Sequence, residues 1–82
     1  MPQGNFAEAW ADSATKQGPI KRMLMRSIAR NPSTMKKLEA EATARAKEQY
    51  GDKYGTLPWD MILTALLPLL MKFLEALLAG KK

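Results

Sequence analysis

The chain has 82 residues, of which 13 are lysine or arginine and 8 are aspartate or glutamate, so its formal net charge is +5. It contains no cysteine and no histidine, which excludes disulfides and argues against zinc sites and catalytic dyads of the usual kinds. A core of this size supplies only a few kcal/mol of net stability, so we expect association with a partner to contribute.

The first predicted helix covers about residues 5–17. Asn5 and Glu8 have the spacing of a capping box, in which two side chains bond backbone N–H groups at the start of a helix. An apolar face then repeats at helical spacing, at Phe6, Trp10 and Ala14. Gly18 precedes a proline, and this pair is expected to end the helix with glycine at its C′ position.

A second helix is predicted over residues 20–30 and a third over residues 32–50. Between them, Asn31 suits the N-cap and Pro32 the first helical position, and Gly51 suits the end of the third helix. The apolar face of the second helix is expected at Ile20, Met23, Leu24 and Ile28. The third helix has a thin apolar face, at Met35, Leu38, Ala42, Ala46 and Tyr50.

Residues 51–55 are expected to form a turn, with Thr56 capping a fourth helix that ends at Gly80. The bulky apolar side chains of this helix fill an arc of roughly 200°, about twice what one neighbouring helix covers. Pro68 should kink it, because proline has no N–H to donate. The sequence therefore predicts an all-α fold: three short-to-medium helices, then a long, proline-kinked, strongly apolar C-terminal helix.

The apolar surplus of residues 56–82 calls for a partner. This segment is expected either to share one small domain with the basic helical region 1–55 or to act as an association or anchor segment. The predicted association face consists of Trp59, Ile62, Leu63, Leu66, Leu67, Leu70, Phe73, Leu74, Leu77 and Leu78.

Three arrangements compete for this face. It could be buried in a homo-oligomer or in a larger protein assembly, cross a membrane as a tail anchor, or lie flat on anionic lipid. The charge-free run 61–71 is short for a membrane span, and Lys72 and Glu75 are costly inside a bilayer. Charge placement therefore favours soluble association.

A basic block occupies the middle of the chain, since no acidic residue lies between Asp12 and Glu39. The residues predicted to bind a polyanion or an acidic partner are Lys21, Arg22, Arg26, Arg30, Lys36 and Lys37. The partner could be nucleic acid bound without sequence preference, or anionic lipid. A solvated basic face that keeps the protein soluble is the alternative.

No phosphate-binding glycine loop, nucleophile motif or metal-ligand cluster is present, so we expect no enzyme activity and no cofactor or metal site. The first residues lack the basic start and apolar run of a secretory signal, so the cytoplasm or a protein assembly is the expected location, with a membrane as the alternative. The sequence predicts a non-catalytic helical interaction protein that associates through its C-terminal helix.

Overall fold

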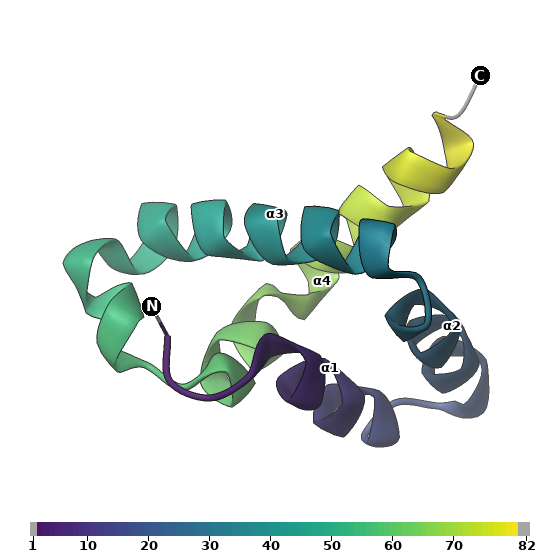
Figure 1. The fold of residues 1–82 in the computed structure, drawn as a ribbon, viewed down its shortest axis with the longest axis horizontal. Helices are drawn as coiled ribbons and strands as arrows, with labels where there is room; N and C mark the ends of the chain where they lie inside the picture. The colour runs from purple at the N-terminus through teal and green to yellow at the C-terminus, as the bar shows by residue number, and fades with distance from the viewer. Residues whose placement is uncertain (1, 81–82) are drawn as a thin grey trace.

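The computed structural model describes residues 2–80, and the all-α prediction is confirmed for them: the structure is 85% helical and contains no strand in this range. Four α-helices follow one another along the chain (Figure 1). They are α1 (Phe6–Thr15), α2 (Pro19–Ala29), α3 (Pro32–Tyr50) and α4 (Trp59–Ala79), with a 3₁₀ helix, η1 (Gly51–Thr56), between the last two.

The predicted asparagine caps are confirmed. The side-chain oxygen of Asn5 accepts a hydrogen bond from the backbone N–H of Glu8 at 3.2 Å, and α1 begins directly after it. Asn31 does the same for the N–H of Thr34, also at 3.2 Å, before Pro32 opens α3. Each cap satisfies one of the backbone donors that the first turn of a helix leaves unpaired.

Two other boundary predictions are wrong. Gly18 is not at the C′ position of α1, whose C-cap is Lys16, but serves as the N-cap of α2 with an ordinary φ of −66°. Thr56 does not cap α4, because its hydroxyl donates to the carbonyl of Lys53 at 2.8 Å within η1. The residue that precedes α4 is instead Pro58, in an extended conformation.

The core forms around α4, which lies between α1 and α3 and packs against both (Figure 1). Aromatic residues fill the end of the core where α1 meets α4: the rings of Phe6 and Trp59 pack edge to face with centroids 4.9 Å apart, and Trp10 stacks beside Phe6. On the other side, the small side chains Ala42 and Ala46 are fully buried and let α3 approach closely. The helix continues through Pro68 to Ala79.

The predicted apolar face of the second helix is partly wrong. Ile28 is buried, but Ile20 and Met23 are exposed, and Met25 is buried in their place. The reason lies in the contact between α1 and α2, where the indole N–H of Trp10 donates to the carbonyl of Met25 at 2.8 Å. This buried hydrogen bond holds α2 against α1, and in this contact the side chain of Met25 is buried whereas those of Ile20 and Met23 are exposed.

The segment before α1 is held against the start of α4. The backbone N–H of Gln3 donates to the carbonyl of Leu57, and the N–H of Trp59 donates to the carbonyl of Gln3, both at 3.0 Å. The second bond satisfies a donor in the first turn of α4, which has no side-chain cap. These two bonds therefore join the N-terminal segment to the apolar helix.

Candidate interaction surfaces

Most of the predicted association face lies in the interior of the protein's own fold. Six of its ten residues are buried: Trp59, Ile62, Leu63, Leu66, Leu70 and Leu74. They recur at helical spacing and form the stripe of α4 that faces α1 and α3. The first three helices thus cover the central part of the apolar arc, and only its margins are left for contact with a partner.

The margins are the other four predicted residues. Leu67, Phe73 and Leu77 are half-buried, and Leu78 is 62% exposed. Two further apolar side chains of α4, Met61 and Leu69, are also exposed, although they were not among the predicted association residues. Met61 lies opposite the buried stripe on a helical wheel, which is the signal that could have found it, whereas Leu69 lies at the edge of that stripe, beside Ile62.

An apolar groove lies where the last turns of α4 meet α2 and α3. It encloses about 310 Å³ and is lined by Leu24, Ser27, Ile28, Asn31, Thr34, Lys37, Leu74, Leu77 and Leu78. Its apolar lining is leucine and isoleucine from α2 and α4, whereas Ser27, Asn31 and Thr34 supply polar groups from α2 and the start of α3. Figure 1 shows the end of α4 extending beyond α2 and α3.

By length and composition, α4 could also cross a membrane. It is the one helix within residues 2–80 that meets this criterion, and a core helix of a soluble protein meets it as well. Its outward face carries Lys72 and Glu75 together with small residues, and both charged side chains are exposed. This composition is compatible with water at that face and leaves the membrane alternative open.

The structure brings three of the six predicted basic residues together. Arg22, Arg26 and Arg30 are spaced by four residues and form one stripe on the side of α2 away from the core. This arginine stripe borders a shallow depression of about 540 Å³, which Met23 also lines. The three arginines therefore make a single linear array of guanidinium groups.

The other three basic residues are separate from this array. Lys21 is exposed on a different side of α2, at helical spacing from the buried Met25 and Ile28. Lys37 borders the apolar groove, whereas Lys36 borders a cavity near Phe6 and Trp59. The six predicted residues are thus distributed over different sides of α2 and α3 and do not form one compact patch.

Among residues 2–80, the one ion pair joins Glu41 and Arg45, one turn apart on α3, with 2.7 Å between carboxylate and Nε. The hydrogen bond to Glu41 raises the pKa of Arg45 above its ordinary value. The arginine stripe has no acidic partner among the described residues. Its charge is therefore available to an external anion.

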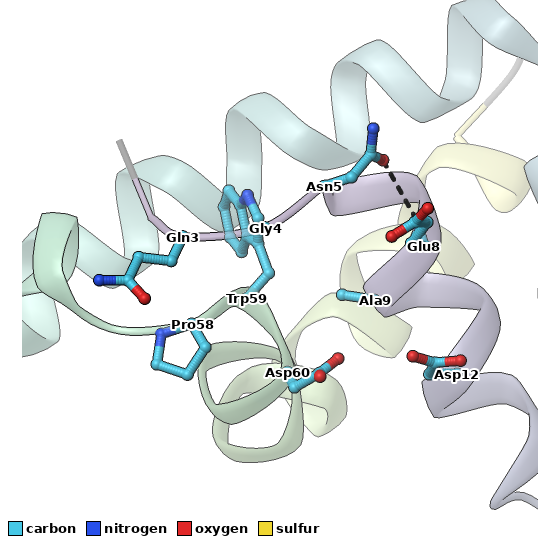
Figure 2. A pocket seen from close by; sticks show the side chains of 9 residues that line it. All are labelled: Gln3, Gly4, Asn5, Glu8, Ala9, Asp12, Pro58, Trp59 and Asp60. Carbon is cyan, nitrogen blue, oxygen red and sulfur yellow. Dashed lines mark hydrogen bonds between the residues drawn. The ribbon is translucent and has the colours of Figure 1, made fainter.

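A third surface, which sequence analysis missed, lies at the opposite end of α1 from α2. Glu8 and Asp12 of α1 and Asp60 of α4 border a cavity of about 290 Å³ beside the Gln3 segment. Figure 2 shows the carboxylates of Asp12 and Asp60 projecting into the space between the two helices. Glu8 and Asp12 are one turn apart in the sequence, but only the packing of α1 on α4 adds the third carboxylate.

These carboxylates do not make a metal centre, because no three metal-ligating side chains in the described part of the chain come close enough together to hold an ion. The candidate site is therefore composed of the apolar groove and the arginine stripe, both of which α2 borders. In comparisons with known proteins, no family model, no curated protein and no solved structure matches this chain.

Proposed function

We propose that this protein is a small, non-catalytic helical assembly protein that associates through its C-terminal helix, with its basic region facing an anionic partner. The observation that carries the proposal is the apolar groove at the open end of α4. Leucine side chains line it, and Leu78 stands 62% exposed at its edge. Exposed apolar surface of this kind is seldom left uncovered in a soluble protein.

The occupant that fits the groove is a second copy of this chain. The end of α4 extends beyond the bundle and is apolar, so it can enter the groove of a partner while the partner's α4 enters its own. Such a two-fold arrangement uses the same surface on both copies. It would bury Leu77 and Leu78 of each copy against Leu24 and Ile28 of the other.

The test is sedimentation velocity in detergent-free buffer over a range of concentrations, comparing Leu78→Glu with the matched control Leu69→Glu. Both leucines are exposed on α4, at 62% and 43%, but Leu69 does not line the groove. Burying the exposed part of Leu78 in both copies should contribute about 2–4 kcal/mol to the dimer, so its loss should weaken dimerisation about 30-fold or more.

We expect wild type and Leu69→Glu to form dimers and Leu78→Glu to remain monomeric with unchanged helical content. Added salt should not weaken the dimer, because its contacts are apolar. A wild type that sediments as a folded monomer at every concentration would refute self-association. Equal weakening by both substitutions would place the interface outside the groove.

The alternative function is that of a small tail-anchored or interfacial membrane protein, and the length and apolar composition of α4 favour it. In that arrangement α4 would leave the core that it shares with α1 and α3. Flotation with lipid after expression distinguishes the two functions. A spanning helix resists extraction by high salt and carbonate, whereas the assembly protein should be in the soluble fraction after that treatment.

A further inference from the structure

The exposed side of α2 combines two features that a soluble surface does not require together. The first is apolar: Ile20 is 83% exposed and Met23 is 70% exposed, the two highest values among the large hydrophobic residues of the described chain. They are three residues apart and therefore neighbours on the helix surface. The core does not use them, since Met25 and Ile28 provide the buried contacts of this helix.

The second feature is the arginine stripe, which runs beside these apolar side chains. Met23 lines the same shallow depression as Arg22, Arg26 and Arg30, so its side chain borders the arginine stripe. Acidic residues are absent from the chain between Asp12 and Glu39, and the described residues offer the stripe no ion pair. An apolar strip bordered by unneutralised arginines is therefore presented on one side of one helix.

We propose that α2 binds the surface of an anionic lipid bilayer. Ile20 and Met23 would enter the boundary between head groups and acyl chains, and the arginines would bind lipid phosphates beside them. A guanidinium group suits this position, because its stem can lie along apolar surface while its planar head bonds phosphate oxygens.

The apolar residues decide between a bilayer and nucleic acid. Nucleic-acid phosphates would account for the arginine stripe, but they offer nothing to Ile20 and Met23 at its edge. A bilayer surface satisfies both parts at once, since its anionic layer covers an apolar interior. This inference rests on the part of the proposed function that assigns the basic region to an anionic partner, and it does not require self-association.

The experiment is co-sedimentation of the full chain with vesicles of phosphatidylcholine alone and of phosphatidylcholine mixed with phosphatidylglycerol. Wild type should bind the mixed vesicles at low salt and lose binding as salt increases, since exposed charges are screened. Replacing Arg22, Arg26 and Arg30 together by glutamine should weaken binding about 100-fold, since about 1 kcal/mol for each charge is about fivefold.

A matched control removes the same charge elsewhere: Arg45, Lys47 and Lys53 together to glutamine. These residues lie at the end of α3 and in η1, far from α2 (Figure 1). The control variant should bind much more tightly than the α2 variant. In a separate variant, Ile20→Ser with Met23→Ser should weaken binding about tenfold at constant charge. Both side chains are exposed, so circular dichroism should show an unchanged fold.

Several results would overturn this inference. They are the absence of binding to mixed vesicles at low salt, equal weakening by the two triple variants, or full binding by the Ile20 and Met23 variant. Tight binding to DNA without binding to vesicles would assign the stripe to nucleic acid instead. Because dimerisation is measured without lipid and depends on Leu78, failure of either experiment leaves the other interpretable.

Discussion

The burial of Leu70 yields a sharp prediction, because this leucine was expected to contact a partner and lies in the interior instead. Its exposed fraction is 0%, whereas Leu78, two turns further along the same helix, is 62% exposed. Leu70→Ala and Leu78→Ala remove the same atoms from the same helix, so they differ only in surroundings. Their comparison tests whether the core of α4 is complete within one chain.

The expected magnitudes differ several-fold. Truncating a fully buried leucine to alanine costs about 2–5 kcal/mol, from lost transfer free energy and the cavity left behind. A domain of this size has only a few kcal/mol of net stability. Leu70→Ala should therefore be largely unfolded or close to it, whereas Leu78→Ala should change the free energy of unfolding by less than about 1 kcal/mol.

The assay is urea denaturation followed by far-ultraviolet circular dichroism at several protein concentrations below the dimer range. We expect the wild-type midpoint to be independent of concentration, because the monomer already buries Leu70. Equal free energies of unfolding for the two variants would refute the arrangement of α4 described above. A midpoint that increases steeply with concentration even for Leu78→Ala would show that copies share their cores.

Three further predictions follow from local contacts, and each is measured as a change in the free energy of unfolding. Trp10→Phe should cost about 1 kcal/mol more than Trp59→Phe, because it alone loses a hydrogen bond to Met25, and equal costs would contradict this. Asn31→Ala should cost about 1 kcal/mol through loss of the cap, and Asn31→Ser much less. Gly51→Ala should cost about 1–3 kcal/mol, since φ is +60° there, whereas Gly18→Ala, with φ of −66°, should cost clearly less.

Helix positions were predictable because their signals are local. Asn31 and Pro32 predict the start of α3. The cap of Asn31 is a hydrogen bond within one turn and proline has a fixed φ, so neither signal depends on the rest of the fold. The orientation of α2 was not predictable, because a wheel places Ile20 and Met25 on different sides without indicating which side meets α1. That choice depends on Trp10, whose indole N–H needs an acceptor when it is buried.

In the candidate site, too, the features of a single helix were predictable and those that depend on packing between helices were not. The arginine stripe was visible in the four-residue spacing of Arg22, Arg26 and Arg30, which is a property of one helix. The apolar groove was not, since it depends on how the end of α4 crosses α2 and α3. The width of the apolar arc on α4 indicated that several neighbours were needed, but those neighbours turned out to include the chain's own α1 and α3.

The two backbone bonds between Gln3 and the start of α4 close a loop that contains α1, α2, α3 and η1. A ribosome releases those helices before α4, so Phe6 emerges while Trp59, on which its ring packs, is still unsynthesised. Native packing of the aromatic end, with the ring of Phe6 on that of Trp59, can therefore form only after synthesis has passed the start of α4. Until then the ring of Phe6 lacks this packing partner.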